Sequence, residues 1–180
     1  TEVVNINDKF VKYNSLMDAK NNGISFVSGD RKKEGILPNL SIYENLVVPL
    51  YKKTSRGGFL GFVDWLELNG IFDWEVDRLS IKTGPRDNLI GSLSGGNQQK
   101  VMIARSFAQH PKVLILNDPA RGIDVSTKRD LYTHLTNYVE EGNTVVFLSS
   151  ELEEFIGLCP KVMVFRNGTV FDIFENEKVN

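Results

Sequence analysis

The sequence predicts an α/β protein built on a parallel sheet. Two apolar runs, Val113–Leu116 and Thr144–Leu148, have the length and composition of strands that are covered on both faces. A helical pattern spans Ser126–Glu141 between them. The side chains expected on its inward face are Leu131, Leu135, Tyr138 and Val139. A strand, a helix and a second strand in this order are typical of parallel strands in one sheet.

Smaller elements are predicted before this unit. Short strands are expected at Glu2–Ile6 and Phe10–Val11, and a buried strand at Ile24–Val27. Ser15 is expected to cap a short helix that runs through residue 20. Gly29–Asn39 has the composition of a charged loop. We therefore expect the α/β core to begin within the first 40 residues.

The middle of the chain predicts helices. Ser41 and Glu44 form a capping box for a helix over Ile42–Val48, which Pro49 is expected to end. Ser55–Leu79 has apolar and aromatic residues at helical spacing and no strand signal, so we expect a mainly helical insert. The aromatic residues of this insert are expected to pack in its core, and for Trp65 and Trp74 the alternative is a surface that docks another protein.

The last part of the chain predicts a β-hairpin. Apolar runs at Val162–Phe165 and Val170–Phe174 flank Asn167 and Gly168. An Asn-Gly pair favours the tight turn that joins two antiparallel strands. Small antiparallel elements are therefore expected beside the parallel core.

Composition limits the classes of function. The chain has 180 residues, enough for one domain with a substantial core, and 41% of them are hydrophobic. Its net charge of -2 gives no reason to expect a nucleic-acid partner. No apolar run approaches the ~20 residues of a membrane-spanning helix, and no signal-peptide pattern opens the chain. The single cysteine, Cys159, is expected to be a small buried residue rather than a catalytic thiol.

The first candidate binding element is Ser94-Gly95-Gly96, at the start of a predicted helix. Its two glycines leave the backbone N–H groups uncovered, and Ser94 adds a hydroxyl donor. The helix dipole and the unsatisfied N–H groups favour an anion at such a position. The helix itself is predicted from an apolar face made of Val101, Ala104, Phe107 and Ala108.

The second candidate is a carboxylate at a strand end. Asn117 and Asp118 follow the apolar run at Val113–Leu116. The carboxyl ends of parallel strands are where α/β sheets place ligand chemistry. In nucleotide-hydrolysing sheets, a carboxylate at this place holds Mg²⁺ or orients the attacking water. Asp118 is therefore a catalytic candidate, with a helix or turn cap as its structural alternative, and Asp124 is expected to cap the following helix.

Four motifs in register resemble those of ATP-binding cassette proteins. Leu93–Lys100 is similar to the signature motif in the form seen in sugar importers, and Val113–Asp124 resembles the Walker B strand plus the D-loop. Ser149–Leu152 is similar to the switch segment of the second cassettes of these importers. Gly29–Gly35 resembles the charged segment at their Q-loop position. The resemblance runs from about residue 1 to residue 175.

This resemblance implies a P-loop NTPase-like core in three parts. Residues 1–40 begin the core, residues 41–92 form a helical subdomain, and residues 93–180 carry the signature helix, Walker B, D-loop, switch segment and hairpin. It also implies an ATPase that uses Mg²⁺ and works with a second cassette, membrane-spanning permease subunits and, indirectly, an extracytoplasmic binding protein. The implied place is the cytoplasmic face of the plasma membrane, where the assembly imports a sugar or related small polar solute.

The resemblance also assigns roles to single residues. In this family, ATP lies between two cassettes, and one cassette presents its signature helix to ATP that the other holds. The residues implied for that contact are Ser94, Gly95, Gly96, Asn97 and Gln98, with Asp124 in the D-loop. The implied catalytic residues are Asp118 and Ser150, and the implied Mg²⁺ position is shared by Asn117 and Asp118.

The chain departs from the family pattern at its own nucleotide site. It contains no Gly-x-x-x-x-Gly-Lys-Ser/Thr loop, so we expect a fragment that binds ATP poorly by itself. Asn117 stands where the family has a Mg²⁺-associated aspartate, and its amide is a poorer ligand for a hard cation. Asp118 stands in place of a glutamate and is one methylene shorter. Ser150 stands at the switch-histidine position of many cassettes, although serine is usual in this branch of the family, and Gly29 stands where a glutamine or glutamate is usual.

These departures predict an asymmetric role. The intact signature serves ATP held by a partner cassette, while the chain's own site is degenerate and hydrolyses little or nothing. The alternative is a non-catalytic regulatory or structural cassette that binds a partner or nucleotide without turnover. A cassette of the DNA-repair type is disfavoured, because residues 55–92 show no sustained heptads.

Overall fold

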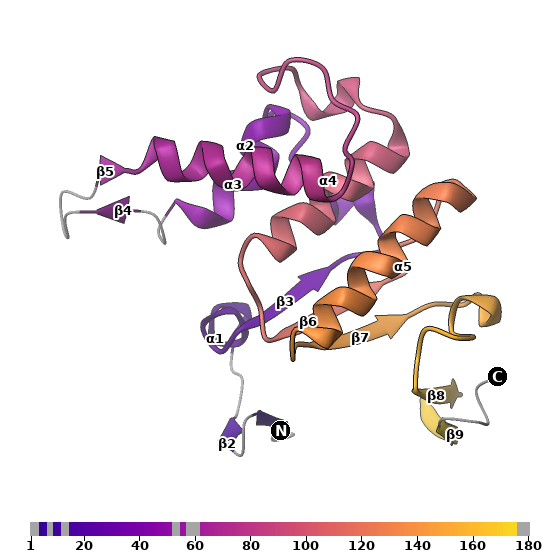
Figure 1. The fold of residues 1–180 in the computed structure, drawn as a ribbon. Helices are drawn as coiled ribbons and strands as arrows, with labels where there is room; N and C mark the ends of the chain where they lie inside the picture. Colours follow the sequence, from indigo (N-terminus) through magenta and orange to yellow (C-terminus); the bar gives the residue numbers. More distant parts are fainter. Residues whose placement is uncertain (1–3, 7–8, 12–14, 52–54, 57–61, 176–180) are drawn as a thin grey trace. The chain divides into compact units, whose positions relative to one another are not determined.

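The computed structural model of the chain describes residues 4–6, 9–11, 15–51, 55–56 and 62–175 (Figure 1). Its contacts divide the chain into two compact units, Thr1–Phe147 and Leu148–Asn180, and each is described by itself. Across the described residues, none of the helices combines the length and the hydropathy needed to cross a bilayer.

A three-stranded sheet lies at the centre of the first unit. Its order is β3 (Ile24–Val27), β6 (Val113–Asn117) and β7 (Thr144–Leu148). β3 and β6 are parallel, and the arrows of β3 and β7 point the same way in Figure 1. Leu114 and Leu116 of the central strand are fully buried. The parallel sheet predicted from the strand–helix–strand order is confirmed.

β7 differs from the buried strand that its apolar run predicts. Val146 is 42% exposed and Leu148 is 45% exposed, whereas Val145 and Phe147 pack against the core. β7 lies at the edge of the three-stranded sheet, and only one of its faces is covered. An unbroken apolar run therefore did not indicate a strand covered on both faces.

Helices α4 (Gly95–Phe107) and α5 (Val125–Glu140) supply much of the core. The predicted inner face of α4 is confirmed, since its four residues are all buried. On α5, Leu131, Leu135 and Tyr138 are buried as expected. Val139 is 47% exposed, and its predicted inward orientation is wrong. It follows Tyr138 directly, and one residue along a helix turns the side chain by about 100°.

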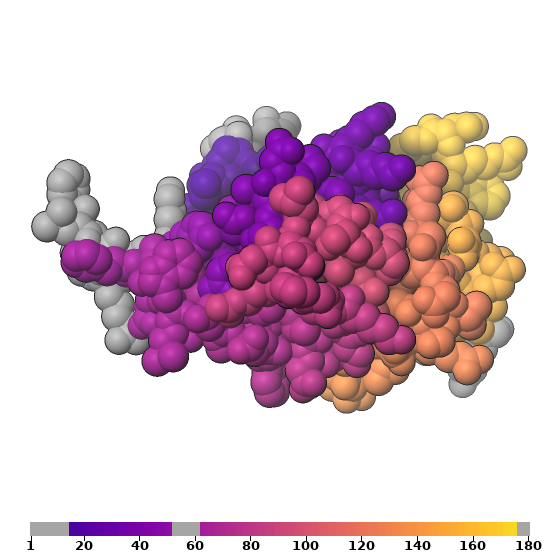
Figure 2. Space-filling model, turned by 90° about the horizontal axis from the view of Figure 1, so that it is seen from above, coloured from indigo at the N-terminus to yellow at the C-terminus, as the bar shows by residue number. Residues whose placement is uncertain are grey.

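The middle segment, residues 41–92, contains helices that pack on α4. The capping box of α2 (Ile42–Val47) is present, because Ser41 Oγ accepts from Glu44 N while the Glu44 carboxylate accepts from Ser41 N. The α-helix ends at Val47, before Pro49 as predicted, and Pro49 lies within the 3₁₀ turn η2 (Val48–Leu50) that follows. α3 (Trp65–Arg78) contacts both α2 and α4. The space-filling view shows this middle segment as one continuous surface (Figure 2).

Two features of the middle segment differ from the sequence prediction. Short antiparallel strands β4 (Ser55–Arg56) and β5 (Phe62–Val63) precede α3, where a mainly helical insert without strands was expected. Trp65 is 57% exposed and Trp74 is 67% exposed, so their predicted core positions are wrong. The face of α3 that packs inward carries Leu68, Phe72 and Glu75 instead.

The elements near the N-terminus mostly match the prediction. β1 (Val4–Ile6) and β2 (Lys9–Val11) form an antiparallel pair, and Ser15 caps α1 (Leu16–Asn21). Glu2 and Val3, with which the first predicted strand begins, lie outside the described residues. The charged segment after β3 contains one helical turn, η1 (Arg31–Gly35), rather than a simple loop. The 3₁₀ turn η4 (Ile90–Ser92) leads into α4.

The second unit consists of a short turn and the predicted hairpin. η5 (Leu152–Glu154) precedes β8 (Lys161–Arg166) and β9 (Thr169–Glu175), which pair antiparallel. Asn167 and Gly168 have φ angles of 52° and 79°, as an Asn-Gly hairpin turn requires. Cys159 is half-buried, and burial raises the pKa of its thiol, as expected for a residue without a nucleophilic role.

Candidate functional site

The signature motif forms the exposed tip of α4. Ser94 is exposed and caps the helix: its Oγ accepts hydrogen bonds from Asn97 Nδ2 at 3.0 Å and Asn97 N at 3.4 Å. Ser94 O accepts from Gln98 N at 2.9 Å. The N–H groups of Gly95 and Gly96 precede the first intrahelical bond and have no acceptor within the helix. The Ser94 hydroxyl accepts both bonds and still has its own proton to donate.

Two neighbours approach the glycines of this tip. A Cβ on Gly95 would lie 2.9 Å from Nη2 of Arg31, and the Nη1 of Arg31 donates to Gly95 O at 2.8 Å. A Cβ on Gly96 would lie 3.5 Å from Cγ2 of Ile123, which is ordinary contact. A side chain at Gly95 would therefore displace the Arg31 guanidinium. The D-loop residue Ile123 lies beside the signature tip.

The side-chain amides of Asn97 and Gln98, which follow the glycines, form hydrogen bonds within the chain. Asn97 Oδ1 accepts from Lys82 N at 2.9 Å, so one amide group binds both the Ser94 hydroxyl and the loop after α3. Gln98 Nε2 donates to Leu93 O at 2.9 Å and to Ile90 O at 3.4 Å. Both side chains fix the shape of the tip. Their direct contact with ATP stays a prediction.

The second candidate lies at the carboxyl ends of the central strands. A Cβ on Gly29 would lie 3.0 Å from Asn117 O and 3.4 Å from Asn117 Nδ2, so the missing side chain at position 29 lets the two strand ends approach closely. Asp118 is half-buried, with a φ of 44°. Its carbonyl accepts from Arg121 N at 3.1 Å. Asp118 therefore occupies a tight turn in the left-handed conformation, which aspartate tolerates better than most residues.

The side-chain oxygens at this strand end do not make a metal site by themselves. The strand end offers the amide oxygen of Asn117 and the single carboxylate of Asp118. In the described part of the chain, no group of three or more His, Cys, Asp or Glu residues could hold a metal ion. Mg²⁺ prefers charged oxygen ligands and usually completes its sphere with phosphates and water. The residues present do not fit a Mg²⁺ ion held by this chain alone, and no chemical step is derived through one.

Asp124 and Ser150 have different surroundings. Asp124 caps α5: its Oδ1 accepts from Thr127 N at 3.0 Å and its Oδ2 from Thr127 Oγ1 at 2.8 Å. The hydrogen bond from the Thr127 backbone lowers the pKa of this carboxyl. The predicted cap is confirmed. Ser150 is exposed in the second unit, and its catalytic role stays a prediction.

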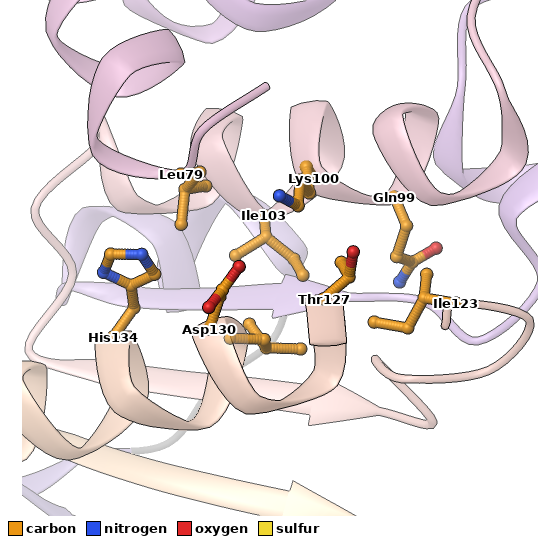
Figure 3. Close-up of a pocket in the computed structure, with 9 residues that line it drawn as sticks. Leu79, Gln99, Lys100, Ile103, Ile123, Thr127, Asp130 and His134 are labelled. Carbon is orange, nitrogen blue, oxygen red and sulfur yellow. The ribbon is translucent and has the colours of Figure 1, made fainter. Parts of the chain in front are cut away.

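Two hollows in the first unit do not match a nucleotide site. Figure 3 shows the smaller one, where His134, Asp130 and Thr127 of α5 face Lys100 and Ile103 of α4. Its volume is about 10 Å³, the space of a single water molecule. Burial lowers the pKa of His134. A larger hollow of about 640 Å³ lies at the amino ends of the strands, beside Gly23 and Ile24.

Arg31 is the residue of this site that sequence reasoning missed. The charged segment Gly29–Gly35 was identified as a substitute for the Q-loop, but no role was given to its single arginine. Arg31 and Gly95 are 64 positions apart, and no local rule joins them. The only sequence signal was a cluster of cations immediately after a strand that leads to the ligand-facing edge.

Comparison with known proteins shows which family this chain resembles. The family profile described as ABC transporter matches residues 3–121. The ribose import ATP-binding protein RbsA of Bacillus cereus is 39% identical over 176 residues, which are 97% of this chain and 35% of that protein. RbsA of Roseobacter denitrificans is 37% identical over 168 residues, which are 93% of this chain and 32% of that protein. The chain thus spans about a third of the length of these relatives.

Solved structures identify the fold. The dimeric bacterial ABC transporter cassette MJ0796 superposes with a TM-score of 0.80 and 22% identity, covering 96% of this chain and 72% of that one. The same cassette in a post-hydrolysis state bound to ADP and Pi gives a TM-score of 0.80 and 21% identity. The predicted P-loop NTPase-like core, with its helical and small antiparallel elements, is confirmed. Since the matched family segment also covers most of its residues, this chain belongs to the ABC transporter family.

Proposed function

We propose that this chain is the energy-coupling part of an ABC importer for a sugar such as ribose. In this proposal, it presents Ser94, Gly95 and Gly96 to ATP that a partner cassette holds. The observation that carries the proposal is the α4 tip, where Ser94 is exposed and two half-buried glycines begin the helix with N–H groups that have no acceptor within it. Donors at a helix N-terminus suit a phosphate group. The naming of the relatives as ribose import proteins supports the solute class.

The same proposal holds that the chain's own nucleotide site, at Asn117 and Asp118, binds Mg²⁺ and catalyses hydrolysis poorly. Asn117 supplies a neutral amide where a charged ligand would bind a hard cation better. Asp118 is one methylene shorter than a glutamate and is held in a tight turn. A displacement of about 1 Å in a catalytic group can cost on the order of 100-fold in rate. ATP hydrolysis in the assembly would then depend on the partner cassette's catalytic groups.

The proposed assembly includes membrane-spanning permease subunits, and α3 offers a surface for them. Trp65, Leu66 and Trp74 are 57%, 85% and 67% exposed on this helix. Trp65 and Trp74 are nine positions apart on this helix and therefore lie on opposite sides of it, so each is a separate exposed aromatic residue of the type enriched where proteins bind a partner. Residues 41–92, which contain α3, are the helical subdomain of the proposed three-part organisation. The proposed location is the cytoplasmic face of the membrane, as a peripheral subunit without a nucleic-acid partner.

The proposal is tested by ATPase measurements on the full-length protein assembled with its membrane subunits. Ser94→Arg places a bulky cation on the tip and removes the hydroxyl, and we expect a loss of turnover on the order of 100-fold. Asp118→Ala is expected to leave most of the turnover. Thr133→Arg is the matched control, because it adds the same side chain at an exposed position of α5 and should have little effect. Loss of turnover in Asp118→Ala with normal turnover in Ser94→Arg would reverse the assignment.

A second function is a regulatory cassette that binds a partner or nucleotide without turnover. The donor set at Asn117 and Asp118 favours it for the chain by itself. Calorimetric titration of the chain with Mg-ATP separates the two. Weak binding, with restored turnover only in the assembly, supports the importer. Micromolar binding by the isolated chain without turnover in the assembly supports the regulatory cassette.

A further inference from the structure

We propose that Arg31 is a positioning residue of the signature tip, which it holds through Gly95 and to which it supplies positive charge for a triphosphate. The inference rests on the proposed function. The observation that supports it most directly is the 2.8 Å hydrogen bond from Arg31 Nη1 to Gly95 O. The second guanidinium nitrogen, Nη2, lies against the same glycine, 2.9 Å from the position of a Cβ. The guanidinium is therefore fixed on the first residue of α4.

The segment that carries Arg31 is itself well anchored. At one end, Ser28 Oγ accepts from Asp30 N at 3.1 Å and donates to the Glu34 carboxylate at 2.6 Å. Asp30 Oδ1 then accepts from Lys33 N at 3.1 Å, which caps η1. At the other end, the guanidinium of Arg105 on α4 donates to Gly35 O. Arg31 consequently projects from a turn whose two ends are both hydrogen-bonded.

The charge of Arg31 has no counter-ion among the described residues. No carboxylate pairs with it there, although its neighbours Asp30 and Glu34 are engaged with Lys33 and Ser28. Its Nε is buried and has no hydrogen-bond partner in the described part of the chain. A helix N-terminus favours anions and disfavours cations. A guanidinium held at this place is therefore unfavourable for the unliganded tip and favourable once an anion binds.

A bound triphosphate would supply the missing counter-ion of Arg31 and would make its charge favourable at the helix N-terminus. It is the anion that the proposed function brings to this tip, and it neutralises Arg31 together with the helix dipole. The glycine at position 95 fits the same account, since a side chain there would displace the guanidinium. A merely structural arginine would instead be expected to stabilise the protein without nucleotide. The two roles therefore predict opposite effects of Arg31 on the stability of the nucleotide-free protein, and a stability measurement can separate them.

The experiment uses the full-length protein assembled with its membrane subunits. Arg31→Gln keeps a side-chain donor and removes the charge, and we expect it to raise the KM for ATP roughly tenfold. Arg31→Lys keeps the charge and should stay within roughly threefold of the wild type. Lys32→Gln is the matched control: it removes the same charge from an exposed neighbour and should leave KM unchanged. The thermal midpoint of the nucleotide-free Arg31→Gln protein should be equal to or above that of the wild type.

Two results would overturn the inference. One is a lower thermal midpoint for Arg31→Gln with an unchanged KM, which would identify Arg31 as a structural contact. The other is an equal KM for Arg31→Gln and Lys32→Gln. Ser94→Arg separates these failures from failure of the proposed function: if it abolishes turnover while Arg31→Gln behaves as the control, only the role of Arg31 is wrong. If Ser94→Arg retains full turnover, the proposed function itself fails.

Discussion

Glu75 is a carboxylic acid inside the hydrophobic core. Its side chain lies on the inner face of α3 and the residue is 1% exposed. Oε1 lies 3.5 Å from Arg78 Nη1, while Oε2 is buried without a hydrogen-bond partner in the described part of the chain. Burial raises the pKa of Glu75 to about 7, and the charge of Arg78 only partly opposes this shift. Folding therefore favours the protonated acid.

This shift predicts how stability depends on pH. Because the pKa is raised on folding, the contribution of Glu75 is fully present below about pH 4.5 and is lost as the pH rises through about 7. Glu75→Gln removes the titration, so we expect the variant to gain stability relative to the wild type by a few kcal/mol between about pH 5 and pH 8. Denaturant unfolding across this range measures the difference. Asp73→Asn, at an exposed position of the same helix, is the control, and parallel curves for wild type and Glu75→Gln would contradict the shift.

Gly35 is a second residue whose surroundings make a quantitative prediction. A Cβ at this position would lie 2.2 Å from Cε and 2.5 Å from Sδ of Met102, which is 2% exposed. Because Met102 has little free space, Gly35→Ala should destabilise the chain by about 1–3 kcal/mol through overpacking. Met102→Ala should remove the clash, so a double-mutant cycle measured by denaturant unfolding should show a favourable coupling of at least about 1 kcal/mol. Strictly additive losses would mean that the two side chains do not compete for space.

Residues governed by local rules were predictable from the sequence. Ser41 and Asp124 cap their helices as expected, because a cap depends on residues only three positions apart. The contact of Arg31 with Gly95 and the approach of Asn117 to Gly29 were not predictable. Each joins segments far apart in the chain, and only the folded sheet and the α4 packing bring them together.

The secondary-structure elements show the same division. The strands and helices of the α/β core were predicted nearly in full, since their apolar periodicity is long and regular. β4 and β5 have two residues each, too few for a periodic signal. The burial of β7 was also mispredicted, because an apolar run does not reveal whether a strand lies at an edge. The sequence thus predicted element type better than element position.

The capping box of α2 supplies a prediction for a whole element. Ser41 Oγ accepts from Glu44 N at 3.1 Å, and this helix carries Ile42, Leu46 and Val47 into the core. Ser41→Ala should therefore cost about 1 kcal/mol of stability, whereas Ser41→Asn should retain most of it because its side-chain oxygen also accepts. Denaturant unfolding is the measurement. Thr136→Ala on α5 is the control, since its hydroxyl bonds only to its own helix at Tyr132 O. Equal losses in Ser41→Ala and Ser41→Asn would rule out the cap as the cause.

At the scale of the whole molecule, the two compact units differ in how much they bury. The first contains the core cluster that joins α2, α3, α4, α5 and the strands β3 and β6. In the described part of the second unit, only Glu154 and Val162 are buried, and Phe165 and Phe171 of the hairpin are each 64% exposed. A two-stranded hairpin without a buried face is at best marginally stable in water.

This contrast predicts unequal protection of backbone amides in the isolated chain. Amides of β6, between two strands and above a buried core, should open only with global unfolding, whereas amides of β8 and β9 should open locally. We expect the hairpin amides to exchange with solvent at least about 100-fold faster than those of β6, a difference of about 3 kcal/mol in opening free energy. Hydrogen exchange followed by mass spectrometry measures both segments in one sample, and β3, the parallel neighbour of β6, serves as the internal reference for core protection. Equal protection of β6 and the hairpin would show that both units unfold as one cooperative structure, because local opening of β8 and β9 would then cost as much as unfolding the core.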